Sequence, residues 1–381
     1  MARPLTILWV VAFCAAQMLH PGGATAQTTN GFASQLVTQP QVPVTPQPGP
    51  APNAQAISQT GLLPLFAVDL QIDPSWIDSS DVPSKSPQFS HSGVNDTFQK
   101  AWDALKPSGF NMVRFQLDPA DPAAPARLAN LCIWAKANNV SLIPVLKYVR
   151  PDRNDKSAMA SAIGVFASTV VSRMHQQDAS VFTDYTQIAY YQLEDSMNHL
   201  GIYPKMTPDT AQQLLVSSAD ALRNSETQAL QGTQVQPTPI LIAASFDYEL
   251  IKQGAIAGIP LDSNAEQRAR ASLKQYLSAL ASATNIDAFN VEWLPRSISS
   301  GDVDHFAPFL RDLKTSIAKQ LSLTTGFSTA FNSPDQQSKF FTLAFTNLAD
   351  FRATDGPTSN FLGVVFRQAF TGPQALSLIH I

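Results

Sequence analysis

The chain has 381 residues, of which 44% are hydrophobic, and a formal net charge of −4. This weakly acidic balance gives no reason to expect nucleic acid as a partner. The sequence holds no glycine-rich phosphate loop and no Cys/His cluster with metal-ligand spacing. It therefore predicts neither a nucleotide enzyme nor a zinc enzyme, and no metal or cofactor is expected.

Residues 1–26 predict a secretory signal peptide. Arg3 supplies the positive start, residues 5–19 form an apolar run, and Ala24 to Ala26 form a small-residue cleavage site. We therefore expect a secreted or periplasmic protein. The apolar run is short for a membrane span, so none is expected after cleavage, and an uncleaved anchor is the alternative. Cleavage leaves Cys132 as the only cysteine, which excludes an internal disulfide.

Residues 27–60 predict a disordered linker. They are rich in Gln, Pro, Thr and Ala, carry almost no charge, and repeat proline between residues 39 and 52. Such a segment cannot bury enough apolar surface to fold. At the other end, residues 376–381 resemble the translation of an adapter used in DNA library preparation, and a natural apolar tail is the alternative. The folded domain is therefore expected at residues 61–375.

Short apolar runs alternate with longer helical segments through this domain. Strands are predicted at residues 65–70, 112–117, 142–146, 188–193, 240–246, 288–293, 321–327 and 362–366. Helices are predicted at residues 96–106, 123–138, 157–176, 208–224, 264–282, 303–319 and 334–348. The strands are nearly continuously apolar, as expected for strands buried on both faces. Pro208 and Pro334 each follow a capping residue and precede an acid, which is typical of a helix start.

Eight strands in strict alternation with helices predict an α/β fold of the (β/α)₈ TIM-barrel type. The pattern contains seven of the eight helices, so the barrel is expected to be truncated before its last helix. An open doubly wound sheet is the alternative. That fold normally has a glycine-rich turn after its first strand, and residues 69–74 contain no glycine.

The carboxyl ends of the strands carry the candidate functional residues, because the active sites of (β/α)₈ barrels lie there. The eight that we single out are acidic, basic, amide or aromatic: Asp69, Arg114, Tyr148, Gln192, Glu194, Asp195, Glu292 and Trp293. Aromatic faces beside carboxylates and amides suit a sugar, which has an apolar face and a rim of hydroxyl groups. The predicted partner is therefore a carbohydrate.

Several of these strands carry motifs of a known family. Residues 109–114, Gly-Phe-Asn-Met-Val-Arg, resemble the G-F-N-x-V-R second strand of the cellulase-like glycoside hydrolases, a large clan of retaining (β/α)₈ glycosidases. Residues 191–196 are similar to the family's fourth-strand motif ending in Asn-Glu, residues 323–329 to its seventh strand, and residues 361–366 to its eighth. The resemblance implies a polysaccharide or oligosaccharide substrate and two catalytic carboxyl groups about 5–5.5 Å apart.

The sequence departs from this family at both catalytic positions. Thr324 occupies the nucleophile position of the seventh strand, and a threonine hydroxyl with no adjacent base is a poor nucleophile. The acid/base position of the fourth strand falls on Ser196, or on Glu194 if the match slips by two residues. At least one carboxyl group of the family mechanism is therefore missing from its usual place.

Two interpretations follow from these departures. In the first, the site is rebuilt and Glu194 and Glu292 are catalytic. Glu194 or Asp195 acts as nucleophile or base, and Glu292 acts as the acid. The substrate-binding residues are then Arg114, Asp69, Gln192, Asp195, Trp293 and Tyr148. In the second, the chain is a pseudoenzyme that binds glycan without cutting it, in an envelope or exopolysaccharide system. A purely structural envelope scaffold is a third possibility.

Overall fold

The structure is a computed structural model in which part of the chain is described. The described residues are 65–80, 87–89, 91–106, 110–149, 155–177, 185–198, 208–245, 265–293, 306–326 and 361–367. The expected signal peptide (1–26), linker (27–60) and tail (376–381) lie outside these residues. The helix predicted at residues 334–348 lies outside them as well.

Eight parallel strands close into a barrel in which each strand pairs with the next and the last pairs with the first. The strands are β1 (Leu65–Asp69), β2 (Met112–Leu117), β3 (Ser141–Leu146), β4 (Tyr191–Leu193), β5 (Ile240–Ser245), β6 (Ala288–Glu292), β7 (Gln320–Gly326) and β8 (Phe361–Arg367). This topology confirms the predicted (β/α)₈ barrel, and it excludes the open doubly wound sheet.

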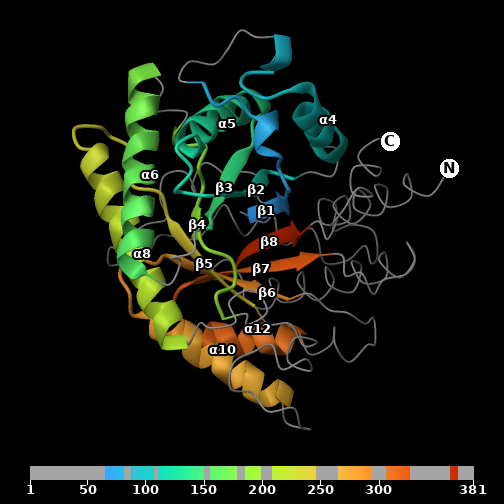
Figure 1. The fold of residues 1–381 in the computed structure, drawn as a ribbon. Helices are drawn as coiled ribbons and strands as arrows, with labels where there is room; N and C mark the ends of the chain where they lie inside the picture. Colours follow the sequence, from blue (N-terminus) through green and yellow to red (C-terminus); the bar gives the residue numbers. More distant parts are fainter. Residues whose placement is uncertain are drawn as a thin grey trace, which may run out of the picture.

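Six α-helices fall within the described residues. They are α4 (Asp96–Leu105), α5 (Ala124–Asn138), α6 (Lys156–Gln177), α8 (Pro208–Ala229), α10 (Ala265–Ala281) and α12 (Phe306–Ser316). Two short 3₁₀ helices, η2 (Pro74–Trp76) and η3 (Pro87–Phe89), follow β1. Figure 1 shows the strands at the centre of the molecule, with the helices arranged around them and α6 and α8 side by side on the outside.

Strand β4 is shorter than the sequence predicts. The apolar run suggests a strand over residues 188–193, but the ladder to β3 contains only Val145–Gln192 and Leu146–Leu193. Ile188 forms a separate bridge to Leu142. The chain therefore meets β3 twice, with a break in between that the apolar pattern does not reveal.

The inside of the barrel changes character along its axis. Met112, Leu241 and Ala288 belong to a small apolar cluster that is separate from the main hydrophobic core. Because side chains two residues apart share one face of a strand, the next inward residues are Arg114 on β2 and Asn290 on β6. The interior of the barrel is therefore apolar near the amino ends of the strands and polar nearer their carboxyl ends.

The barrel closes at a seam between β8 and β1 that depends on a glycine. Gly363 has φ +144°, and it pairs with Leu65. A Cβ atom on Gly363 would lie 1.8 Å from the main-chain oxygen of Leu65. Only glycine fits this approach of two main chains, because any side chain would collide with the neighbouring strand.

Helices α6 and α8 pack closely because small side chains face each other. A Cβ atom on Gly164 would lie 2.8 Å from Ser225 Oγ. Residues Lys156–Met174 of α6 are long and apolar enough to cross a membrane by length and composition. Ile163 and Phe166 of this segment are buried in the main hydrophobic core, as expected of a helix that covers a barrel.

A polar cluster is buried between the barrel and α8, and we call Tyr185, Tyr191, Glu226 and Thr238 the Glu226 cluster. Glu226 accepts hydrogen bonds from the Tyr185 hydroxyl and, at 2.9 Å, from the Thr238 N–H. The Tyr185 and Tyr191 hydroxyls lie 3.4 Å apart. Burial raises the pKa of Glu226, and the hydrogen bonds from Tyr185 and Thr238 offset this only in part. Burial also raises the pKa of both tyrosines, so it disfavours the charged form of all three groups.

Candidate functional site

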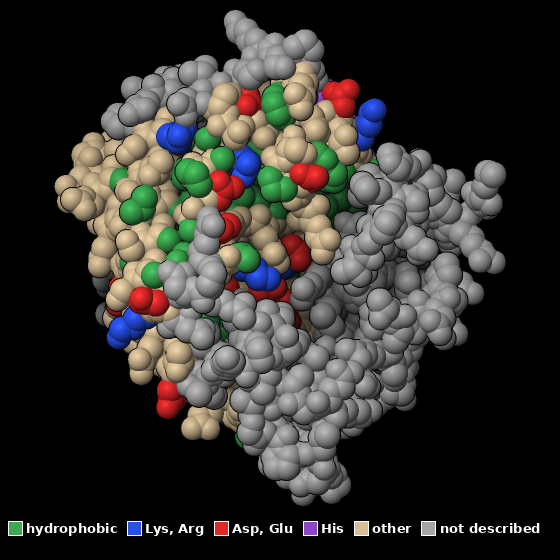
Figure 2. All heavy atoms as spheres, viewed as in Figure 1, with side chains coloured by type: hydrophobic (Ala, Val, Ile, Leu, Met, Phe, Trp, Pro, Cys, Tyr) green, Lys and Arg blue, Asp and Glu red, His purple; other side chains and the backbone are tan. Residues whose placement is uncertain are grey.

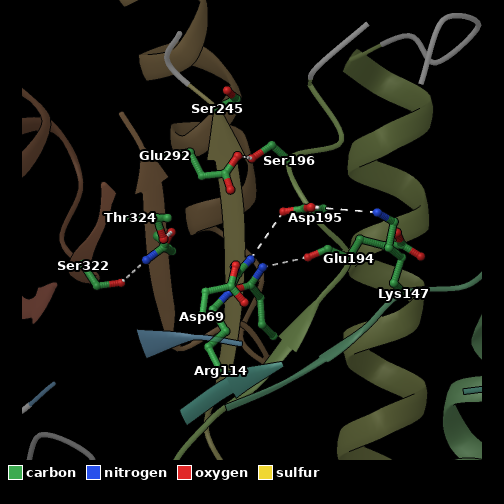
Figure 3. Close-up of polar contacts among 12 residues, drawn as sticks. Asp69, Arg114, Lys147, Glu194, Asp195, Ser196, Ser245, Glu292, Ser322 and Thr324 are labelled. Atoms are coloured by element: carbon green, nitrogen blue, oxygen red, sulfur yellow. Dashed lines mark hydrogen bonds and ion pairs between the residues drawn. The ribbon is translucent and has the colours of Figure 1, made fainter. Parts of the chain in front are cut away.

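The structure places all eight predicted site residues toward the carboxyl ends of the strands. Four of them lie within strands: Asp69 in β1, Arg114 in β2, Gln192 in β4 and Glu292 in β6. The other four follow a strand by one or two residues: Tyr148 after β3, Glu194 and Asp195 after β4, and Trp293 after β6. Figure 2 shows charged side chains gathered toward the middle of the face seen in Figure 1. Figure 3 shows the polar groups converging from several strands.

Arg114 is the centre of this arrangement, and with Asp69, Gln192 and Asp195 it forms what we call the Arg114 cluster. Its side chain is fully buried. Nη1 donates to Asp69 Oδ2 at 2.6 Å, Nη2 donates to Asp195 Oδ1 at 3.3 Å, and Nε donates to Gln192 Oε1 at 2.9 Å. A buried guanidinium needs such partners because removing it from water is costly. The residues come from β1, β2, β4 and the turn after β4.

The electrostatics keep Arg114 charged. Burial lowers the pKa of Arg114, but the negative charges of Asp69, Asp195 and Glu292 outweigh burial and raise the pKa above its ordinary value. The influence of Glu292 shows that this carboxylate, at the end of β6, also acts on the guanidinium. Three carboxylates from three parts of the barrel therefore share one buried cation.

Asp195 lies between two cations. Its Oδ2 atom is 3.9 Å from Nζ of Lys147, in addition to the contact between Oδ1 and Arg114. Lys147 follows β3 and keeps 26% of its side chain exposed, whereas the side chain of Asp195 is 1% exposed. Figure 3 shows Asp195 between the two positive groups. The pair of cations stabilises a negative charge on Asp195.

Glu292 reaches across the barrel to the end of β4. Its Oε2 atom accepts a hydrogen bond from the Ser196 hydroxyl at 2.6 Å. Glu292 is 2% exposed and Ser196 is fully buried. Ser196 is one of the two positions, with Glu194, at which the family resemblance expects the acid/base carboxyl group. A carboxyl group carried by β6 therefore lies beside the β4 position that lacks one, as Figure 3 shows.

The β7 side of the site is neutral. The Thr324 hydroxyl donates to Asn290 Oδ1 at 2.5 Å, and the Asn290 amide donates to Ser322 Oγ at 2.8 Å. All three side chains are fully buried. The hydroxyl proton of Thr324 is held by an amide oxygen, so among the residues that the structure describes no base is placed to activate this hydroxyl as a nucleophile.

Glu194 differs from the other acids of the site, because its carboxylate binds main chain. Its Oε1 atom accepts a hydrogen bond from the Tyr148 N–H at 2.7 Å, and its side chain is buried. Its backbone is left-handed, with φ +57°. The structure therefore places Glu194 at the junction of β3 and β4, while Asp195 takes the position beside Arg114.

The two aromatic candidates are buried. Tyr148 is 6% exposed and Trp293 is 5% exposed, and both belong to the main hydrophobic core. The main-chain N–H of Trp293 donates to the Thr324 carbonyl at 2.8 Å, which continues the ladder between β6 and β7. Both residues therefore pack the rim of the barrel where the strands end.

The sequence did not single out Ser322 or the pair Asn198 and Ser245. The Asn198 side chain donates to the Ser245 carbonyl and accepts from the Ser245 N–H, both at 2.9 Å, so it joins the turn after β4 to the end of β5. Strand alternation from Thr324 back to Ser322 was a usable signal for Ser322. A loop asparagine such as Asn198 offers no comparable pattern.

Over the described ranges, no group of three or more His, Cys, Asp or Glu side chains is placed to hold a metal ion. The acids at the mouth of the barrel instead contact arginine, lysine, serine or main-chain N–H groups.

No protein-family model and no curated protein matches the sequence. Solved structures of similar fold include a β-glycosidase, a virulence factor and a GH53 catalytic domain. The crystal structure of β-glycosidase BGL167 is 10% identical over 79% of this chain and 85% of that chain, with a TM-score of 0.48. Virulence factor SghA from Agrobacterium tumefaciens is 12% identical over 80% and 87%, with a TM-score of 0.47. The GH53 catalytic domain from Ignisphaera aggregans is 14% identical over 80% and 84%, with a TM-score of 0.45.

Proposed function

We propose that this chain is a glycosidase that acts on a polysaccharide or oligosaccharide outside the cytoplasm, with Asp195 and Glu292 as its catalytic pair. The observation that carries the proposal is the 2.6 Å hydrogen bond between Ser196 and Glu292. It brings a carboxyl group of β6 to the residue next to Asp195. Two carboxyl groups on different strands at one end of a barrel are what glycoside hydrolysis requires.

The surroundings of Asp195 suggest its role. Asp195 faces Arg114 and Lys147, which stabilise the ionised form that a nucleophile or base needs. Glu292 is the second carboxyl group, and we assign it the role of the acid that protonates the leaving glycosidic oxygen. This role requires Glu292 to take up a proton first, because the hydrogen bond from Ser196 and the charge of Arg114 both favour its ionised form. Asp195 then attacks the sugar carbon or takes a proton from the attacking water. The bond between that carbon and the glycosidic oxygen breaks.

Two sequence features support the substrate and the location. Residues 109–114 resemble the second strand of the cellulase-like glycosidases, and Arg114 of this motif is the centre of the site. Residues 1–26 have the features of a secretory signal. Asp69 and Gln192 hold Arg114 from either side, and the partly exposed Lys147 is suited to bind sugar hydroxyl groups.

The test is a glycan panel with product analysis on the full chain. Asp195→Asn and Glu292→Gln should each lower the rate of sugar release at least about 10²-fold, because each removes a group that transfers a proton or attacks. Asp103→Asn and Asp209→Asn, at exposed helix positions, are controls that also turn a carboxylate into an amide, and they should keep wild-type rates. Wild-type rates in both site variants would exclude this pair.

A second candidate function is glycan binding without cleavage. The observation that favours it is Thr324, which stands at the family's nucleophile position and donates its proton to Asn290. It predicts measurable affinity for an oligosaccharide by titration calorimetry, with no new reducing ends after long incubation. A chain that binds no glycan of the panel would instead support the structural-scaffold interpretation.

A further inference from the structure

The end of β4 breaks the alternation of a regular strand. The Gln192 side chain points into the barrel, where it binds Arg114, and Leu193 lies in the main hydrophobic core outside it. With a period of two, Glu194 would point inward next and Asp195 would point away from Arg114. Asp195 instead contacts Arg114 Nη2 at 3.3 Å. The conformation at Glu194 therefore changes the side of the strand on which the next side chain, Asp195, lies.

The backbone of Glu194 accounts for the reversal. Its φ of +57° lies in the left-handed region, which is sterically unfavourable for a residue with a side chain. Only two other non-glycine residues of the described chain, Ser92 and Asn139, have a positive φ. Such a conformation persists where surrounding contacts hold it.

In those contacts the side chain of Glu194 accepts the hydrogen bond that its main-chain carbonyl would accept in a regular strand. In a parallel ladder the hydrogen bonds are evenly spaced, and the Glu194 N–H still donates to the Leu146 carbonyl at 3.0 Å. The next donor on the β3 side, the Tyr148 N–H, would regularly meet a main-chain carbonyl. It meets Glu194 Oε1 at 2.7 Å instead. The Glu194 carbonyl has turned to accept from Gln192 Nε2 at 2.9 Å.

We propose that Glu194 is a positioning residue whose left-handed backbone, held by the bond between its carboxylate and the Tyr148 N–H, turns Asp195 toward Arg114 and Lys147. Its carboxylate oxygen is engaged by main chain, so Glu194 acts through Asp195 and not on the substrate. Gln192 joins the two parts, because it accepts from Arg114 and donates to the turned carbonyl. The consequence for turnover rests on the proposed function, whereas the consequence for Asp195 does not.

A pair of variants separates positioning from catalysis. Glu194→Gln keeps an acceptor oxygen for the Tyr148 N–H, so it should retain most of the turnover of the full chain. Glu194→Ala loses the acceptor and should lower kcat about 10²-fold with little change in KM, because a small misplacement of a reacting group has that effect. If kcat of Glu194→Gln falls as far as kcat of Glu194→Ala, Glu194 is a catalytic residue and the proposal is wrong.

A second measurement needs no substrate. Aspartate labelled with ¹³C at the carboxyl carbon reports the titration of Asp195 by NMR, with the signal assigned from Asp195→Asn. Both variants remove the carboxylate of Glu194, so the effect of positioning is the additional movement of the titration curve in Glu194→Ala relative to Glu194→Gln. Asp195 curves that coincide in the two variants would overturn the proposal. If no glycan is cut by the wild-type chain, the proposed function fails while this result still decides the role of Glu194.

Glu194→Asp replaces the alanine variant if the latter does not fold. Aspartate tolerates the left-handed conformation better than most residues, but its side chain is one methylene shorter and does not reach the Tyr148 N–H in the same way. The same displacement of the Asp195 signal is expected. An Asp195 signal at the wild-type position in this folded variant would contradict the proposal.

Discussion

The two buried polar clusters of this barrel hold their carboxyl groups in opposite ways. In the Arg114 cluster, Asp69 and Asp195 face a guanidinium whose pKa stays above its ordinary value. In the Glu226 cluster, the carboxyl group faces a tyrosine hydroxyl and a main-chain N–H, and burial raises its pKa. In one cluster the acids face a charged partner, and in the other the acid faces neutral groups and burial raises its pKa.

The difference shows which property distinguishes a buried acid of a candidate site from a buried acid of the packed core. Glu226 belongs to α8, and the Tyr185 hydroxyl and the Thr238 N–H both bind one of its two carboxyl oxygens, Oε1. The Arg114 cluster draws on β1, β2 and β4 and is within reach of Glu292 on β6. Burial alone does not separate them, since both are almost fully enclosed. The charge of the partners does.

The largest effect should come from removing the cation of the first cluster. Arg114→Met leaves the carboxylates of Asp69 and Asp195 buried without the guanidinium that both contact, so the free energy of unfolding should fall by about 3–5 kcal/mol. Urea unfolding measures this. Arg127→Met is the matched control: it breaks a partly exposed pair with Asp121, and it should cost at most about 1 kcal/mol. Equal losses of unfolding free energy in both variants would show that the buried charge pairs stabilise the fold no more than the surface pair.

A smaller effect is expected in the second cluster. Tyr185→Phe removes the hydroxyl that donates to Glu226, and it should cost about 1–3 kcal/mol of unfolding free energy because it leaves a buried acceptor short of a donor. Tyr276→Phe is the control, since the buried Tyr276 hydroxyl has no hydrogen-bond partner within the described chain. It should be close to neutral in the same denaturation experiment. A loss in Tyr276→Phe as large as that in Tyr185→Phe would show that the bond to Glu226 contributes nothing specific.

The smallest effect is a slope of stability with pH. Since folding raises the pKa of Glu226 above its ordinary value of 4.5, the folded chain binds more protons than the unfolded chain in the range just above that value. This contribution to stability is complete below pH 4.5 and is lost as the pH rises through the folded pKa, by at most about 1.4 kcal/mol per pH unit. Glu226→Gln should lack this component. Parallel curves of unfolding free energy against pH for the two proteins would show that folding does not raise the pKa of Glu226.

The sequence predicted the fold more completely than the site. Apolar runs and helix-start signals located the eight strands, because strands buried on both faces leave an unbroken hydrophobic pattern. Strand ends also predicted that Asp69, Arg114 and Glu292 lie at the same end of the barrel.

The sequence could not predict the contacts that give these residues their roles. The reversal at Glu194 depends on a main-chain N–H of another strand, and the bond from Ser196 to Glu292 joins residues that lie far apart in the chain. Tyr148 and Trp293 were expected to face a sugar, yet tertiary packing places both in the core. Side-chain periodicity predicts a face, and it cannot predict a left-handed turn that changes the face.

The seam at Gly363 has a consequence for how the chain reaches its folded state. The outer edge of β1 stays unpaired until β8, near the other end of the domain, has been made and has docked against it. During that interval β1 presents open main-chain donors and acceptors to other chains, which is a risk for aggregation. Pairing between such distant segments also slows folding. A chain exported as we propose would gain from this delay, because the barrel cannot close before its last strand is present.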